Sequence, residues 1–104
     1  MGFELAVLSS GGDVVRLGLS GRLEVGDTLD FHKACQPVIK DLGSSALQLD
    51  LERLSYIDSS GIGALVVMHN RARDEGWRMS LCNCNGDIMK VLRLLNLHRL
   101  FHIV

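Results

Sequence analysis

The apolar residues of this 104-residue chain change their period several times, and this alternation constrains the fold more than any other feature. Val15, Leu17 and Leu19 alternate with Arg16 and Gly18, which is typical of a half-buried strand. Later segments repeat their apolar residues at helical spacing, and short apolar runs separate them. An opening strand pair followed by alternating helices and strands predicts an α/β domain, a mixed sheet with helices packed against it.

We expect the elements to follow the order ββαβαβαβ. The first two strands form a hairpin, because the Gly11-Gly12 pair supplies the positive φ of a tight turn. The first helix contains Pro37, which removes one helical hydrogen bond, so we expect a kinked helix rather than two segments. The predicted strands cover 3–8, 14–19, 46–51, 77–82 and 100–104, and the predicted helices cover about 28–42, 60–76 and 85–95.

The size and charge of the chain exclude several classes of protein. Residues 1–104 suit one domain with one core. The net charge is −1, and the 11 basic and 12 acidic residues are mixed along the chain, which argues against a nucleic-acid partner. No apolar segment approaches the ~18 residues that span a bilayer, and the first residues lack signal-peptide features. We therefore expect a cytoplasmic protein without a membrane partner.

The three cysteines, Cys35, Cys82 and Cys84, cannot all pair with one another, which suits reduced thiols. Cys82 and Cys84 would share one face of a strand, and a Cys-x-Cys pair can bind metal. No second Cys/His pair with ligand spacing accompanies it, so we expect two small packed side chains. The sequence predicts no metal and no cofactor.

The segment Ile57-Asp58-Ser59-Ser60-Gly61-Ile62-Gly63 joins an apolar run to an amphipathic stretch. Small hydroxyl residues beside an acid are usual helix N-caps, and in this position they also present a serine to a partner or a modifying enzyme. The Gly-x-Ser-x-Gly pattern of a hydrolase is absent, and no histidine can be placed beside the serines. The glycines lack the other residues of a phosphate-binding loop. We therefore expect no enzymatic activity.

Taken together, these residues resemble the anti-sigma factor antagonist family, the bacterial members of the STAS domains. Asp58–Gly63 is similar to the family's most specific motif, Asp-Ser-Ser/Thr-Gly-hydrophobic-Gly. Leu19–Glu24 resembles its Leu-x-Gly-Glu-Leu-Asp signature, and residues 91–103 resemble its closing helix and strand. The resemblance implies a single STAS-like domain over residues 1–104. Many members carry a further C-terminal helix, which we expect to be absent here because the chain ends at Val104.

The resemblance also implies a function. In this family the unmodified protein binds an anti-sigma factor, usually also a serine kinase of the GHKL type, and so frees a sigma factor. The kinase phosphorylates the serine directly after the motif aspartate, here Ser59, and the complex dissociates. A PP2C-type phosphatase restores the active form. The chain would then be a phosphoprotein that regulates transcription by partner switching and is monomeric when free.

Partner-binding residues are expected around the phosphoacceptor. The motif residues and two family-variable positions make up this set: Asp58, Ser60, Gly61, Gly63, Arg22 and Glu24. Arg22 stands where the family commonly has Glu, and Glu24 where it commonly has Asp, so partner choice can differ.

The helix after the motif offers a further candidate surface. Ala64, Val67, Met68 and Arg71 would form a partly apolar face, which is either buried core or a partner-binding face. We include Val67 and Met68 among the candidate binding residues. His69 is expected to be a core or boundary histidine rather than a ligand or a pH sensor.

Two alternatives share the fold but not the function. STAS subunits of ABC-type lipid-transport complexes act as scaffolds on an ATPase, and they often have other residues in place of the phosphoacceptor pair. A stressosome or chemosensory relative would be phosphorylated as well but would serve a different output.

Overall fold

The computed structural model describes residues 2–104. The elements are β1 (Phe3–Ser9), β2 (Val14–Leu23), α1 (Thr28–Lys40), β3 (Ala46–Asp50), β4 (Leu54–Ile57), α2 (Ser59–Glu75), β5 (Met79–Cys82), α3 (Gly86–Leu94) and the 3-10 helix η1 (Leu97–Arg99). They form one α/β domain with a mixed five-stranded sheet, as the sequence predicts.

The observed order is ββαββαβα, which corrects the predicted order in two places. β4 is an additional strand that was not predicted, and it lies within the apolar run before the serines. The expected closing strand over 100–104 is reduced to a single bridge between Ile103 and Leu81. The reason is that η1 and the turn after it occupy residues 97–101, so few residues remain to pair with the sheet.

The sheet is organised around β2. β1 pairs with it in the antiparallel sense, and the Gly11-Gly12 turn of this hairpin has the expected positive φ at both glycines. On the other side of β2, β3 runs parallel to its first half and β4 runs parallel to its last residues. β5 then pairs with β3. β3 and β4 therefore follow one another along the same side of β2, which brings the end of β4 beside the end of β2.

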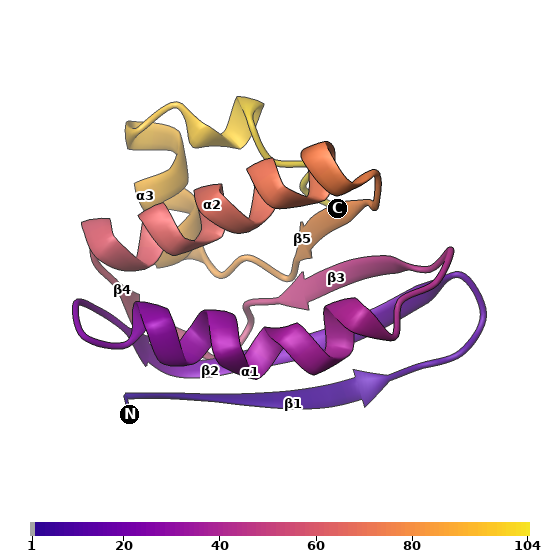
Figure 1. Cartoon of the computed structure of the whole chain (residues 1–104). Helices are drawn as coiled ribbons and strands as arrows, with labels where there is room; N and C mark the ends of the chain where they lie inside the picture. The colour runs from indigo at the N-terminus through magenta and orange to yellow at the C-terminus, as the bar shows by residue number, and fades with distance from the viewer. Residues whose placement is uncertain (1) are drawn as a thin grey trace.

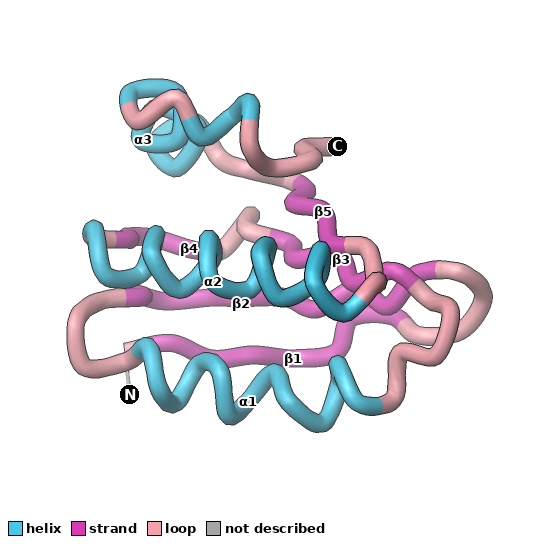
Figure 2. The backbone as a smooth tube through the Cα atoms, turned by 45° about the horizontal axis from the view of Figure 1, so that its top comes forward, coloured by secondary structure: helices cyan, strands magenta, loops and turns pink. Residues whose placement is uncertain are grey.

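Helices α1 and α2 lie side by side over one face of the sheet (Figure 1), and α3 packs beside β4. Figure 2 shows α1 and α2 in front of the strands, with α3 and η1 to one side. A single helix, α1, runs through Pro37 without division into two segments, as expected. Among residues 2–104, no helix is both long enough and apolar enough to cross a bilayer.

The core lies between these two helices and the sheet. Both helices contribute large side chains with almost no exposed surface, and the strands contribute mostly leucines: Phe31, Cys35, Leu65, Met68, Leu17, Leu19, Leu23, Leu47, Leu49 and Leu81. Burial raises the pKa of the Cys35 thiol to about 12, so this cysteine stays protonated and packs as a small apolar residue.

Candidate partner-binding site

The N-terminal end of α2 is held in place by the carboxylate of Asp58, which is the N-cap of the helix. Its Oδ1 accepts a hydrogen bond from Gly61 N at 2.9 Å, and its Oδ2 accepts one from Val25 N at 2.9 Å. These bonds favour the charged carboxylate and lower the pKa of Asp58. Asp58 therefore ties the loop after β2 to the first turn of α2, and neither oxygen is left unpaired.

Gly61 allows this first turn to lie directly on the end of β2. A Cβ at this position would collide with the backbone oxygen of Leu23 and would come within 2.7 Å of Ile57 Cγ1. The glycine in the motif is therefore a requirement of packing between α2 and the sheet.

Ser59 is the first residue of α2, and its side chain is exposed. Within residues 2–104, its hydroxyl makes no hydrogen bond to another side chain or to the backbone. Gly63 and Val67 follow it at i+4 and i+8, so the three residues share one stripe of the helix. The space around Gly63 is open, and 55% of Val67 is exposed. The phosphoacceptor candidate therefore begins an uncovered stripe on α2.

Arg22 and Glu24 lie beside this helix end and neutralise one another. Arg22 donates to Glu24 through both Nε (3.2 Å) and Nη2 (3.0 Å), which raises the pKa of Arg22. The guanidinium also lies 4.2 Å from the ring centre of Tyr56, its neighbour across the β2–β4 ladder. The fold thus brings two of the predicted residues, far from the motif in sequence, to the strand that leads into Asp58.

Met68 is a correction to the predicted site. Its side chain is 1% exposed and belongs to the core, as does Ala64. Adjacent residues on a helix are separated by about 100°, so Val67 faces outward while Met68 faces the sheet. Val67 therefore remains a candidate for partner contact, and Met68 does not. His69 is half-buried, with its ring centre 5.6 Å from that of Phe101 in an edge-on arrangement.

Two exposed apolar residues near the motif were not predicted. Val25 is 76% exposed, although its backbone is bound to Asp58, and Tyr56 is 42% exposed. The signal in the sequence was an apolar residue placed next to the Gly26-Asp27 turn, where a polar residue is more usual. We call Val25, Tyr56, Ser59, Gly63 and Val67 the Ser59 surface. It is partly apolar, which suits contact with another protein.

The hydroxyl of Ser59 follows the capping residue Asp58 at the start of α2. Across residues 2–104, no histidine forms a hydrogen bond with it, and no group of three or more His, Cys, Asp or Glu side chains is placed to hold a metal ion. Cys82 ends β5, whereas Cys84 lies beyond it, and burial raises the pKa of both thiols. β5 pairs with β3, whereas β4, which leads to Ser59, pairs with β2, so the cysteines belong to a different part of the sheet.

Comparison with known proteins gives matches over nearly the whole chain. A family model described as "Mlab, STAS domain" matches residues 6–104. A STAS-domain containing protein of Pseudomonas aeruginosa is 31% identical over 98 residues, which cover 94% of this chain and 95% of that protein.

Solved structures share the fold. A putative anti-sigma factor antagonist from Thermotoga maritima is 25% identical, with a TM-score of 0.78 over 97% of this chain and 84% of that one. The Bacillus cell fate determinant SpoIIAA in its phosphorylated form is 22% identical, with a TM-score of 0.66 over 98% of this chain and 90% of that one. The SpoIIAA match supports the fold alone.

Proposed function

The chain belongs to the STAS-domain family described as Mlab, and we propose that within it this protein acts as an anti-sigma factor antagonist. Its unphosphorylated form binds an anti-sigma factor that is also a GHKL-type serine kinase, and a sigma factor is released. Phosphorylation of Ser59 ends this binding, and a PP2C-type phosphatase reverses the modification. The chain itself performs no catalysis in this cycle.

The observation that carries the proposal is the position of Ser59. The side chain is exposed at the first position of α2, directly after a capping aspartate whose two oxygens are already bound within the fold. Because Asp58 is engaged, the neighbouring hydroxyl is the free polar group that a partner meets there. Val25, Tyr56 and Val67 are exposed apolar residues on the elements that meet at this helix end.

Phosphorylation would act on this surface rather than on the fold. A phosphate adds about −1.5 to −2 charges at neutral pH. The backbone N–H groups and the dipole at the N-terminus of α2 partly offset that charge, so the domain remains folded. A partner that packs closely on Val25 and Val67 has no room for a hydrated phosphate between them. Loss of the complex therefore follows from a local change.

The test is intact-mass measurement after incubation with the GHKL-type kinase of the same genome and ATP. The wild-type chain should gain one phosphate, and Ser59→Ala should gain none. Ser60→Ala is the matched control, because it removes the neighbouring, half-buried hydroxyl and leaves Ser59 in place. Gel filtration of the same samples should show a complex with the kinase that disappears once the phosphate is added.

Transfer of phosphate to Ser59→Ala would place the modification elsewhere. Absence of transfer with every such kinase would remove the switch altogether.

A second candidate is the non-phosphorylated scaffold subunit of an ABC-type lipid-transport complex. It is favoured by the family match, whose description names Mlab and not an anti-sigma factor antagonist. This candidate predicts that the chain copurifies with an ABC-type ATPase, and that Ser59→Ala leaves the complex intact. The leading proposal also predicts that Ser59→Ala stays bound to its own partner, so copurification with an ABC-type ATPase is the result that separates the two candidates.

A further inference from the structure

The other end of α2 carries a small cavity of about 280 Å³, away from the Ser59 surface. His69, Ala72 and Arg73 of α2 line it, together with Trp77 before β5 and His102 near the C-terminus. Arg78 and Met79 complete the wall. The groups come from three separate parts of the chain, so the cavity is a product of the tertiary fold.

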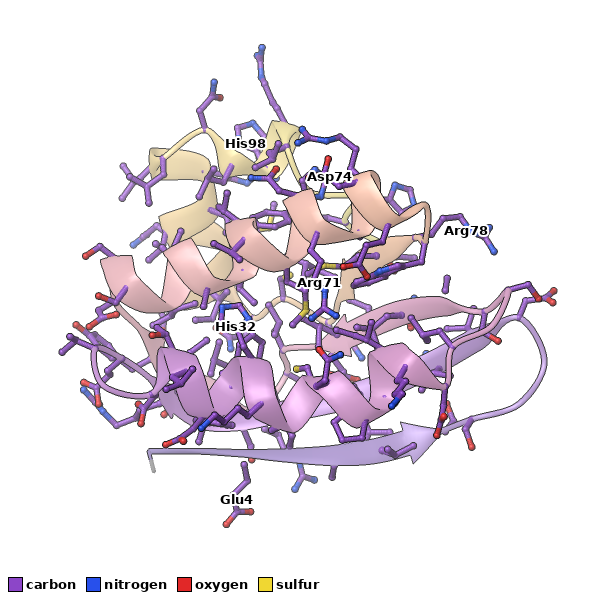
Figure 3. All side chains as sticks on the ribbon, viewed as in Figure 1. Glu4, His32, Arg71, Asp74, Arg78 and His98 are labelled. Atoms are coloured by element: carbon purple, nitrogen blue, oxygen red, sulfur yellow. The ribbon has the colours of Figure 1, made fainter. Side chains whose placement is uncertain are left out.

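The polar groups of this cavity are all of one kind. Two arginines and two histidines line it, and among the described residues, 2–104, no carboxylate does. The C-terminal dipole of α2 accounts for a cation at Arg73. It does not account for Arg78 or His102, which belong to other segments. Within residues 2–104, neither of these two side chains forms a hydrogen bond or a salt bridge, and Arg78 extends from the turn into solvent (Figure 3).

The two acids nearest in sequence bind residues of the cavity wall but do not line the cavity themselves. Asp74 pairs with Arg73 at 3.3 Å in an exposed contact that solvent screens strongly. Glu75 accepts hydrogen bonds from Arg71 Nε at 2.8 Å and from Trp77 Nε1 at 3.1 Å, and these bonds lower the pKa of Glu75. The ionised Glu75 therefore holds the edge of the indole, and the ring of Trp77 is fixed before any ligand arrives.

The walls of the cavity are mainly apolar. Ala72 and Met79 are buried, and Trp77 packs against the core while it also lines the cavity. Ligand sites commonly have volumes of roughly 300–1,000 Å³ with apolar walls and a few polar groups, and this cavity falls just below that range. A cavity of about 150 Å³ already holds benzene, so this one has room for a larger planar ring system with an anionic substituent.

We propose that this cavity, the Trp77 site, binds a small planar organic anion, with the ring of the ligand against Trp77 and its negative group between Arg73 and Arg78. Aromatic carboxylates and nucleoside monophosphates share this chemistry. The inference is independent of the proposed function, because it concerns the opposite end of α2 and does not require Ser59.

The hollow on the open face of the sheet is different in kind. It has a volume of about 290 Å³ and contains Asp50 and Glu52 beside Arg53. Asp50 already accepts hydrogen bonds from Glu52 N and Asn83 Nδ2. Its acids would repel an anion, and its buried acid needs no further partner, so it carries no comparable site.

The Trp77 site can be tested by NMR on the full chain, because Trp77 is the single tryptophan and its indole N–H gives one resonance. Sodium benzoate and AMP represent the two sources of the anion. Inorganic phosphate provides the charge without a ring, and benzyl alcohol provides a ring without the charge. Benzoate or AMP, or both, should move the indole resonance in a saturable way, and the better of the two identifies the source. Phosphate and benzyl alcohol should bind at least about tenfold more weakly.

The variant Arg73→Ala/Arg78→Ala should weaken binding of benzoate or AMP by about tenfold or more, since it removes the charge-assisted contacts. Both residues are exposed, so the spectrum away from the cavity should stay unchanged. Arg93→Ala, an exposed arginine on α3 outside the cavity, is the matched control and should bind as the wild type does. Three results would each overturn the proposal: no saturable shift up to about 10 mM of either anion, equal binding of benzyl alcohol, or unchanged affinity in the double variant.

Discussion

The two ends of α2 present different surfaces for different reasons. At the N-terminal end, Asp58 and Gly61 seal the helix onto the sheet, and what remains outside is the open Ser59 surface. At the C-terminal end, α2 stops at Gly76 with φ 81°, and the chain turns away, so that Trp77 and the arginines surround a cavity. The N-terminal end, packed onto the sheet, leaves an exposed surface that suits contact with a protein. The C-terminal end leaves a cavity that suits a small molecule.

The largest expected effect on the free energy of unfolding comes from the buried side of α2, which packs on the sheet between the two ends. Met68→Ala should lower the free energy of unfolding by about 2–5 kcal/mol, because it leaves a cavity under the middle of the helix. Val67→Ala, one residue away on the exposed side, should change it by less than about 0.5 kcal/mol. Urea denaturation followed by circular dichroism measures both. Equal losses of unfolding free energy in the two variants would mean that Val67 is buried. Val67 would then not belong to the Ser59 surface.

Gly61→Ala is directed at the N-terminal end alone. The new methyl group would meet the backbone at Leu23, which cannot move without disturbing β2, so we expect a loss of about 3 kcal/mol in unfolding free energy. The Trp77 indole resonance should change little in the fraction that remains folded, because the clash lies at the other end of the helix. A large shift of that resonance would show that the two ends are coupled.

Gly63→Ala should have the opposite sign. The space around Gly63 is open, and alanine in a helix interior is favoured over glycine by about 1 kcal/mol, so the free energy of unfolding should rise. The same methyl group stands on the Ser59 surface and should weaken the complex with the kinase partner. Thermal denaturation and a binding titration on the same sample separate the two effects. An unchanged affinity would mean that the partner does not contact this stripe.

The smallest expected effect is one of pH. Hydrogen bonds lower the pKa of Asp58 at one end of α2 and of Glu75 at the other. A lowered pKa stabilises the fold above about pH 4, the usual value in an unfolded chain, and that contribution is lost as the pH falls through the lower folded-state value. Asp58→Asn and Glu75→Gln should therefore each make stability less dependent on pH in acid.

Thermal midpoints measured from pH 2 to about 6 provide the comparison. Asp58 joins two elements, whereas Glu75 bonds only to Arg71 and Trp77 nearby, so Asp58→Asn should have the larger effect. A larger effect of Glu75→Gln would mean that the carboxylate at the Trp77 end contributes more to stability than Asp58 does.

Local patterns in the sequence predicted most of the fold. The Gly11-Gly12 hairpin and the cap residue Asp58 each act over a few neighbouring residues, so their effect could be derived directly. β4 was missed because it pairs with β2 over only three residues and follows β3 without a Gly or Pro between them. Here the sequence offers no local break to detect.

The candidate site was predictable only in part, for two physical reasons. Ala64 to Met68 is apolar at every position, so periodicity could not decide which side of α2 faces the core, and Met68 was assigned to the wrong side. The Trp77 site depends on residues from α2, the turn before β5 and the C-terminal segment, and no short motif connects them.

The hydrogen bond from Val25 N to Asp58 joins residues 33 positions apart. Under the proposed function, the phosphoacceptor is therefore part of a conformational epitope and not of a linear motif. A peptide of the segment around Ser59 would lack Val25 and the strand that orients the capping carboxylate. A nascent or unfolded chain would present the serine without this surface. The kinase would therefore phosphorylate only molecules that have finished folding.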